Sequence, residues 1–428
     1  MLDSCSSSAT TPAGQMRAGH DAKAATHWAF ATVVPALRKC AAQAADASAQ
    51  CCCSRAAQHQ DQPPPQPPPP AGYVCRPGEL PRLDSTCSTA STAAHPASPA
   101  RPPRPPCKAD YAWVRVIGAG SFGRVSLARE LEGGRLVAIK TLNKVAIIRE
   151  SQVQHVLDER AMLARVAGYP FLINLLTSFQ DTDNIYLVMD YVPGGEFFTH
   201  MRDNGPLHEM HARFYVAQII LALEHLHGKG IAYRDLKPEN LLIGADGYVR
   251  LTDLGFAKVV TTHTYTLCGT PDYLAPEVIM NQGHTTAVDW WSLGCVVYEM
   301  LHGFPPFYTG NPQDTYTRIL HRSFKFPSKF GPYAVDLIDK LLTVDPSSRL
   351  GGGPEGVQAI KDHPWFTNLD WGLVTAKAYQ PPHVPKLAAP DDTRCFDSFE
   401  HLPPLESAAG LTKLQQDWFR PFSLAPIC

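Results

Sequence analysis

The sequence contains no run that approaches the roughly 18 apolar residues of a membrane-spanning helix, so no transmembrane segment is expected. Its formal net charge is only −2, which lacks the basic excess typical of nucleic-acid-binding chains. The twelve cysteines follow no zinc or disulfide spacing, and the adjacent Cys51, Cys52 and Cys53 are either acylation sites or, as their Ala-rich neighbourhood favours, incidental thiols. We therefore expect reduced thiols, a cytoplasmic location with the nucleus as a second one, and no nucleic-acid partner.

Proline and charge are unevenly distributed along the chain. Residues 1–109 hold 17 of the 39 prolines, together with ten Lys or Arg and six Asp or Glu, a net of +4 that leaves −6 for the remainder. Such a segment cannot bury enough apolar surface to offset its ordering entropy, so residues 1–109 are expected to form a disordered extension. The remaining sequence is long enough for a core of two lobes, and its acidic balance suits basic peptide substrates.

Residues 233–240 read Tyr-Arg-Asp-Leu-Lys-Pro-Glu-Asn, which places an Asp, a Lys and an Asn in one short loop. These are the groups needed to move a phosphoryl group onto a hydroxyl. Asp235 would accept the hydroxyl proton, Lys237 would neutralise the transferring phosphate, and Asn240 would ligate Mg²⁺. A match with several fixed positions rarely arises by chance, but a loop with scattered charges is the alternative, so the hypothesis requires partners elsewhere in the chain.

Partners occur upstream in the required order. Residues 117–125 read Ile-Gly-Ala-Gly-Ser-Phe-Gly-Arg-Val, in which missing side chains would let backbone N–H groups approach phosphate oxygens, although a tight hairpin alone would also use these glycines. The strand-like Val-Ala-Ile-Lys segment that follows places Lys140 within reach of the α- and β-phosphates. Glu159, in a stretch with helical apolar spacing, would pair with Lys140.

A second metal ligand is expected downstream. Asp253-Leu254-Gly255 follows a predicted strand at 248–252, and Asp253 would supply a carboxylate to Mg²⁺. Leu254 occupies the place where this motif usually has Phe, but it is still large and apolar. Ala-Pro-Glu closes the segment, and its Glu277 is predicted to form a buried ion pair with Arg349.

Together these motifs resemble the AGC group of serine/threonine protein kinases over residues 111–366, most closely the cAMP-dependent and next the cGMP-dependent kinases. The resemblance implies an α+β, bilobal protein kinase fold. It has a small β-rich lobe (111–189), a hinge (190–193), a large helical lobe (194–366) and a C-terminal AGC tail (367–428). It also implies ATP and Mg²⁺ as cofactors. The ATP site would comprise Ile117, Gly118, Ala119, Gly120, Ser121, Phe122, Gly123, Arg124, Val125, Ala138, Lys140, Glu159, Met189, Asp190, Val192, Glu196, Leu242 and Phe396.

The same resemblance assigns substrate residues. Substrate arginines would contact Glu196, Glu239 and Glu299, and an apolar residue after the phosphoacceptor would contact Leu267, Pro271 and Leu274, which implies Arg-Arg-x-Ser/Thr-apolar substrates. Thr270 would lie beside the catalytic Asp and Lys.

Regulatory features follow from the resemblance as well. An upstream kinase would phosphorylate Thr266, and the phosphate would be bound by Arg234, Lys258 and His155. Phe419 and Phe422 would fill a small-lobe groove, with Ser423 after them as an optional phosphorylation site. A separate cyclic-nucleotide-binding regulatory chain is the expected partner. The alternatives are an AGC kinase controlled by phosphorylation alone, which includes a cGMP-dependent type, and a non-catalytic scaffold, which the intact motif set disfavours.

Overall fold

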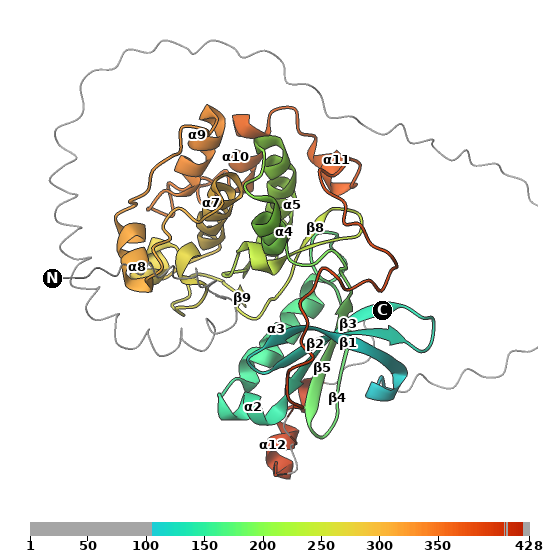
Figure 1. The fold of residues 1–428 in the computed structure, drawn as a ribbon. Coiled ribbons are helices and arrows are strands. Elements are labelled where there is room, and N and C mark those ends of the chain that lie inside the picture. Colours follow the sequence, from blue (N-terminus) through green and yellow to red (C-terminus); the bar gives the residue numbers. More distant parts are fainter. Residues whose placement is uncertain (1–104, 406, 408–409, 423–428) are drawn as a thin grey trace, which may run out of the picture.

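The computed structural model describes residues 105–405, 407 and 410–422. The predicted extension therefore lies outside the described residues apart from 105–109, and Ser423 lies outside them too. Among the described helices, none is both long enough and apolar enough to cross a membrane. Figure 1 shows two lobes, one built around a sheet and one built mainly from helices, as the bilobal prediction requires.

The small lobe is a five-stranded antiparallel sheet in the order β1-β2-β3-β5-β4. The β-branched and aliphatic residues of these segments suit a half-buried pleated surface. Strand β3 leads directly into α2 and then α3, which carries Glu159. The elements are η1 (Lys108–Asp110), β1 (Tyr111–Gly120), β2 (Gly123–Glu130), β3 (Leu136–Asn143), α2 (Lys144–Arg149), α3 (Val153–Val166), β4 (Leu175–Gln180) and β5 (Asn184–Asp190).

One boundary differs from the prediction. The sequence places Asp190 in the hinge, whereas β5 continues through Asp190 because its N–H donates to the Asn174 carbonyl at 3.2 Å and it pairs with Val137 of β3. The sheet therefore extends one residue into the segment predicted as the hinge.

The large lobe is organised around two helices, α5 (Glu209–Gly228) and α7 (Ala287–His302). Both are apolar on nearly every side, and a helix of that kind is stable only when neighbouring elements surround it. The surrounding elements are α4 (Phe197–Asn204), α6 (Pro276–Ile279), α8 (Pro312–Leu320), α9 (Pro332–Leu341), α10 (Val357–Lys361), η4 (Pro364–Phe366) and α11 (Trp371–Thr375).

Short strands and turns lie on the side of the large lobe that faces the sheet, between α5 and the small lobe (Figure 1). They form two small antiparallel pairs, β6 with β9 and β7 with β8. The predicted strand at 248–252 is β8, slightly shorter than expected. These elements are β6 (Ile231–Ala232), η2 (Pro238–Asn240), β7 (Leu241–Ile243), β8 (Val249–Leu251), β9 (Lys258–Val259) and η3 (Pro271–Tyr273).

The predicted ion pair between Glu277 and Arg349 is present and buried. Arg349 Nη1 and Nη2 donate to the two carboxylate oxygens of Glu277 at 2.8 and 2.9 Å. The guanidinium also donates to three backbone carbonyls, so its donors are matched in a site without water access. This bidentate contact fixes α6 to the segment that precedes α10.

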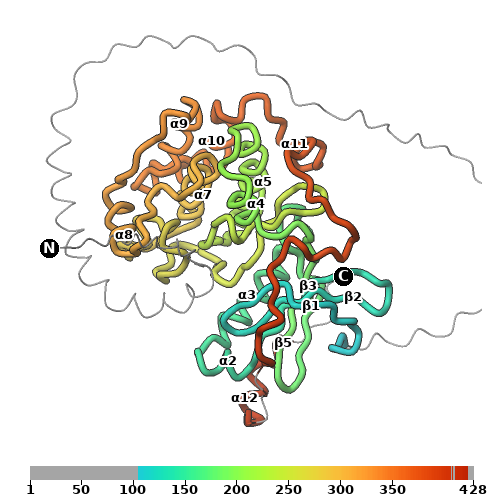
Figure 2. Tube along the Cα trace, in the orientation of Figure 1, coloured from blue at the N-terminus to red at the C-terminus, as the bar shows by residue number. Residues whose placement is uncertain are grey.

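The tail returns from the large lobe to the small lobe, as the tube trace in Figure 2 shows. On the way it is tied to the small lobe and hinge: Arg115 donates to Thr393 Oγ1 (3.1 Å) and to the Asp397 carbonyl (3.0 Å), and Tyr191 Oη donates to the Asp392 carbonyl (2.7 Å). It ends in α12 (Lys413–Asp417) and η5 (Arg420–Phe422).

Both tail aromatics are buried, which confirms the predicted docking. The carbonyl of Phe422 accepts from Ser178 Oγ at 2.8 Å, and that of Phe419 accepts from Gln180 Nε2 at 2.8 Å, so η5 is fixed to β4. The ammonium group of Lys144 lies 5.3 Å from the centre of the Phe419 ring and donates to Gln416 of the tail. Burial lowers the pKa of Lys144.

We expect the docked aromatics to contribute strongly to stability. Phe419→Ala and Phe422→Ala should each lower the free energy of unfolding by about 3 to 5 kcal/mol, the usual cost of removing a buried Phe. Urea-induced unfolding of the full chain measures the change. Leu414→Ala is the matched control, because Leu414 lies in the same tail and is largely exposed. A similar midpoint for all three variants would contradict the docking.

Candidate active site

One buried carboxylate, that of Asp289, fixes the loop that carries Asp235. Asp289, in the first turn of α7, accepts hydrogen bonds from the backbone N–H groups of Tyr233 (2.8 Å) and Arg234 (2.7 Å). Its Oδ2 also lies 2.7 Å from His227 Nε2 on α5. Arg234 has φ 70°, a conformation that non-glycine residues rarely adopt, so these bonds stabilise a strained backbone immediately before Asp235.

Four of the predicted catalytic side chains form one hydrogen-bonded network. Thr270 Oγ1 donates to Asp235 Oδ1 (2.9 Å), and Asn240 Nδ2 donates to Asp235 Oδ2 (2.9 Å). Lys237 Nζ lies 3.0 Å from Asp235 Oδ2 and donates to Thr270 Oγ1 at 2.7 Å. Each carboxylate oxygen thus has fixed partners, so the rotamer of Asp235 is set in advance of any substrate.

A second cluster lies between the lobes. Lys140 Nζ on β3 is 2.6 Å from Glu159 Oε1 on α3 and 3.9 Å from Asp253 Oδ1. Burial lowers the pKa of Lys140, but the carboxylates of Glu159 and Asp253 outweigh burial and hold its pKa above the usual range. The ammonium group therefore remains charged. Asp253 itself has φ 58° and follows the loop in which Thr252 N–H donates to the Asn240 carbonyl at 2.9 Å.

Asn240 and Asp253 suit a magnesium ion. Because the amide nitrogen of Asn240 donates to Asp235, the amide oxygen is the ligand atom that remains, and Mg²⁺ prefers oxygen ligands. In the described part of the chain, no group of three or more His, Cys, Asp or Glu side chains could hold a metal by itself. A Mg²⁺ ion here would therefore depend on further oxygens, such as those of phosphates.

The glycine-rich turn joins β1 and β2, with Ser121 and Phe122 at its tip. A Cβ on Gly123 would lie 1.8 Å from the Thr141 carbonyl oxygen, so the fold itself requires that glycine. A Cβ on Gly120 would contact nothing, and one on Gly118 only the Val125 side chain. The fold does not explain these two glycines, whereas close approach of a ligand to the backbone does.

An apolar wall of packed side chains lies beside this turn. Ile117 and Ala138 are buried together with Leu127, and Val125 and Phe396 pack against them, so the tail contributes to the wall. The Ala138 backbone on β3 pairs with Met189, which lies near the end of β5. The remaining predicted pocket residues lie on the turn or at the lobe junction: Ala119 and Arg124 in β1 and β2, Val192 after β5, and Glu196 and Leu242 at an isolated bridge between α4 and β7.

Two of the three predicted acidic substrate residues have raised pKa values. Burial raises the pKa of Glu299 to about 8, with the nearby charges of Glu239 and Asp272 adding to the effect, and Tyr273 Oη donates to Glu299 Oε2 at 2.6 Å. Burial likewise raises the pKa of Glu239, whose Oε2 is buried without a hydrogen-bond partner. Glu196 instead lies exposed at the N-cap of α4.

The predicted apolar substrate pocket follows in the chain. Leu274 is buried, Leu267 packs against the main core, and Pro271 begins η3. All three therefore lie on the segment that carries Thr270.

The three cations predicted around Thr266 make other contacts. Lys258 Nζ donates to Thr264 Oγ1 at 3.0 Å, His155 contacts the N-cap residue of α3, and Thr266 itself is exposed. A neutral hydroxyl attracts a cation weakly, so the local geometry decides which threonine Lys258 bonds. The predicted role of these cations concerns a phosphate on Thr266, so it stays a prediction.

Sequence reasoning missed Asp289, His227 and Tyr273. Asp289 reads as an ordinary acidic residue in the first turn of a helix, where it would favour the helix dipole. The one available signal was that the following turns of α7 are mostly apolar, a pattern typical of a buried helix whose polar residues have partners inside the protein.

Replacement of Asp289 should loosen the catalytic loop. In Asp289→Asn an amide N–H would face the donors of Tyr233 or Arg234, and hydrogen bonds to a charged group contribute about 1.5 to 3 kcal/mol each, so we expect stability to fall by at least that amount. Chemical denaturation measures the loss, and amide hydrogen exchange at residues 233 and 234 should accelerate. Asp314→Asn is the control, because Asp314 is an exposed acid in the first turn of α8. Unchanged exchange would refute the role of Asp289.

Comparison with known proteins agrees with this geometry. Residues 111–366 match the protein kinase domain family. The chain is 46% identical over 292 residues to cAMP-dependent protein kinase type 3 of Saccharomyces cerevisiae, covering 68% of this chain and 73% of that protein. It is 46% identical over 290 residues to the human cAMP-dependent protein kinase catalytic subunit PRKX, covering 68% and 81% of the two chains. The Drosophila melanogaster cAMP-dependent protein kinase catalytic subunit 3 is 45% identical over 290 residues, covering 68% and 50%.

The match to the protein kinase domain covers more than half of the chain, and the similarity extends over most of the yeast and human relatives. The chain therefore belongs to the protein kinase family and is a serine/threonine kinase of the AGC group.

Proposed function

We propose that this chain is a Mg·ATP-dependent kinase that phosphorylates Ser or Thr in Arg-Arg-x-Ser/Thr-apolar segments, as a catalytic subunit in cAMP signalling. The observation that carries the proposal is the coexistence of two intact clusters. One joins Asp235, Lys237, Asn240 and Thr270, and the other joins Lys140 to Glu159 and Asp253. A non-catalytic scaffold would have no need to keep both.

Asp235 is the proposed acceptor of the substrate proton. Thr270 and Asn240 each bond one of its oxygens, which fixes the carboxylate so that a substrate hydroxyl can be oriented rather than merely deprotonated. Lys237 lies 3.0 Å from the same carboxylate, where its charge would also neutralise a phosphoryl group in transit. Thr270 would position both side chains.

The nucleotide would be held between the lobes. Backbone N–H groups at Gly118 and Gly120 and the ammonium of Lys140 would bind its phosphates, and the wall formed by Ile117, Ala138 and Phe396 would contact the adenine ring. Mg²⁺ held by Asn240 and Asp253 would supply charge neutralisation at the phosphates. Leu254 replaces the usual Phe but is buried in the main core, so Asp253 keeps its support.

Preference for substrate arginines would come from the acidic cluster. Glu239 presents a buried oxygen with no partner, and burying an unpaired carboxylate is costly unless a ligand pairs with it. A guanidinium satisfies that requirement better than an ammonium because of its fork of donors. Glu299 and Glu196 would contribute further carboxylates, while Leu267, Pro271 and Leu274 would line the apolar subsite.

Control of this activity is proposed at three levels. A separate cyclic-nucleotide-binding chain would hold the kinase inactive, an upstream kinase would phosphorylate Thr266, and phosphorylation of Ser423 would be optional. The names of the yeast, human and fly relatives place those proteins under cAMP control, and the 46% identity supports the same for this chain. We propose a cytoplasmic location with a nuclear pool.

Removal of the proposed proton acceptor tests the assignment. Asp235→Ala should lower the single-turnover rate by about 10²- to 10⁴-fold, the usual contribution of a general base, because the hydroxyl is no longer oriented. Affinity for Mg·ATP, measured by titration calorimetry, should change little. Asp314→Ala, an exposed Asp on α8, should have neither effect. A normal phosphoryl-transfer rate in Asp235→Ala would overturn the proposed mechanism.

The raised pKa of Glu299 predicts a pH-dependent KM. The carboxylate is charged only above its pKa of about 8, so the KM for an Arg-Arg-x-Ser peptide should fall as pH rises toward that value. The limiting slope is about tenfold per pH unit for one titrating group. Steady-state kinetics with saturating Mg·ATP give the profile.

Two controls separate this effect from others. Glu299→Gln should have a high KM without the pH dependence, and a peptide that lacks both arginines should show little difference between wild type and variant. If the wild-type KM for the arginine peptide is flat across this pH range, Glu299 does not bind a substrate arginine.

A further inference from the structure

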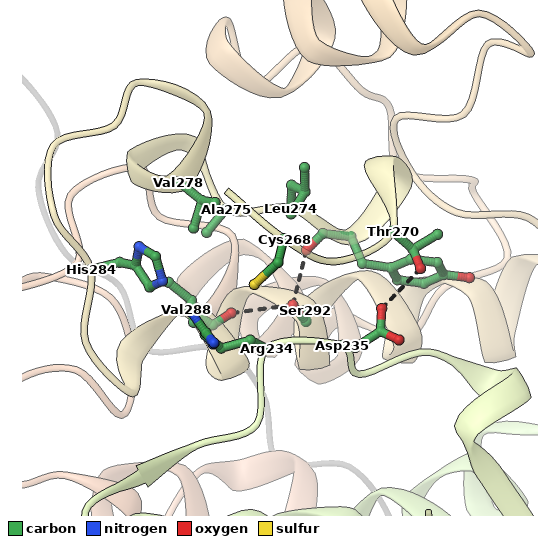
Figure 3. A pocket seen from close by; sticks show the side chains of 11 residues that line it. Arg234, Asp235, Cys268, Thr270, Leu274, Ala275, Val278, His284, Val288 and Ser292 are labelled. Carbon is green, nitrogen blue, oxygen red and sulfur yellow. Dashed lines mark hydrogen bonds between the residues drawn. The ribbon is translucent and has the colours of Figure 1, made fainter. Parts of the chain in front are cut away.

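A small cavity lies between the catalytic loop, the activation segment and the beginning of α7 (Figure 3). Its walls include Arg234, Cys268 and His284. His284 is 3% exposed, and its Nε2 is buried without a hydrogen-bond partner. Nη1 of Arg234 is also buried without a partner. Two unpartnered nitrogens on the wall of one cavity indicate a missing hydrogen-bonding group.

The size of the cavity limits what that group can be. Its volume is about 10 Å³, which is about the minimum for a single water molecule. A separate small-molecule ligand does not fit. A group attached to the neighbouring activation segment is a better candidate, because it can approach the edge of the cavity from outside without having to fit within it.

The activation segment is paired directly with His284. The N–H of Thr264 donates to the His284 carbonyl at 2.9 Å, and the N–H of His284 donates to the Thr264 carbonyl at 2.8 Å, which makes an isolated antiparallel bridge. Thr266 follows Thr264 by two residues and is exposed to an incoming kinase. A phosphate on Thr266 would therefore be attached two residues from the bridge that holds His284.

We propose that His284 is a positioning residue that binds, together with Arg234, the phosphate carried by Thr266, and thereby makes the phosphorylated state pH dependent. This inference rests on the proposed role of Thr266 as the switch. Arg234 Nε already donates to the Phe256 carbonyl at 2.8 Å, so Nη1 is the nitrogen that remains for the phosphate. Lys258, which bonds Thr264, would neutralise a further part of the charge.

The charges around His284 determine its protonation. Burial, followed by the positive charge of Arg234, lowers the pKa of His284 to about 4, so the imidazole is neutral at neutral pH. The groups that face it come from every neighbouring element: Arg234 and Asp235 from the catalytic loop, Lys258 from β9, Cys268 from the activation segment, Glu277 from α6 and Asp289 from α7.

A phosphate on Thr266 would reverse this balance. Its charge of about −1.5 to −2 would oppose the effect of Arg234 and favour the imidazolium, so binding of the phosphate would take up a proton. Without phosphate, a His pKa below its unfolded value means that stability falls as pH decreases. With phosphate, the contact should strengthen as pH falls from about 8 to about 6, below which the phosphate itself is protonated.

Protection from a phosphatase measures the contact. The full chain phosphorylated on Thr266 is treated with a protein phosphatase at about pH 6.5 and about pH 8, and loss of phosphate is followed by mass spectrometry. At the lower pH, His284→Phe should lose phosphate roughly tenfold faster than wild type, the factor that corresponds to one charged hydrogen bond. At the higher pH the two rates should converge. His284→Gln, which keeps a donor but cannot titrate, should be protected equally at both pH values.

A matched control comes from α5. His225 also has a buried Nε2 without a partner, but it stacks on Tyr169 at 4.1 Å. His225→Phe should leave the phosphatase rate unchanged at both pH values. An equal acceleration in His225→Phe and His284→Phe would show general loosening and overturn the inference.

The outcomes distinguish this inference from the proposed function. If Thr266→Ala retains full kinase activity, the switch itself is wrong. If Thr266→Ala is inactive but His284→Phe is dephosphorylated as slowly as wild type at both pH values, the switch stands and the role of His284 is overturned. Should His284→Phe fail to fold, NMR titration of His284 in the wild-type chain decides: its pKa must rise on phosphorylation, and an unchanged pKa overturns the proposal.

Discussion

The active site depends on the contact between the Asp289 carboxylate and the backbone of the catalytic loop. Helix α7 is buried almost throughout its length, so this carboxylate is both rigidly placed and shielded from water, which strengthens its hydrogen bonds to Tyr233 and Arg234. Those bonds hold Arg234 in a left-handed conformation that its side chain disfavours. The direction of the next residue, Asp235, is therefore set by the first turn of a buried helix.

The nucleotide side of the site has a different kind of support. Lys140 is held by Glu159, and α3, which carries Glu159, packs in the same core as the tail aromatics Phe419 and Phe422. The tail also supplies Phe396 to the apolar wall beside the glycine-rich turn. A segment more than two hundred residues downstream in the sequence thus supports both the lysine and the pocket, so the tail is part of the catalytic structure.

Local patterns predicted much of this arrangement. Apolar periodicity located α3, α5 and α7, and the fixed spacing of Asp235, Lys237 and Asn240 identified the reactive loop, because groups in one short loop must lie close together. Asp289 and the Tyr273–Glu299 bond were missed since their partners lie far away in sequence, where spacing carries no information. The hydrogen bond from Lys258 to Thr264 illustrates the same limit, because it depends on local geometry that no motif encodes.

Buried polar atoms without a hydrogen-bond partner lie on both sides of the reactive loop. On one side the atom is an acceptor, and on the other it is a donor. An acceptor, Glu239 Oε2, lacks a partner on the side where substrate arginines are proposed, and a donor, Arg234 Nη1, lacks one beside the activation segment. A fold optimised for stability alone would pair or exclude such groups, because each costs free energy when buried. Both atoms lie near Asp235, where ligands are proposed to bind. A cationic substrate would supply the partner that Glu239 lacks, and an anionic phosphate would supply the partner that Arg234 lacks. Completion of the hydrogen-bond network would then accompany activation and substrate binding.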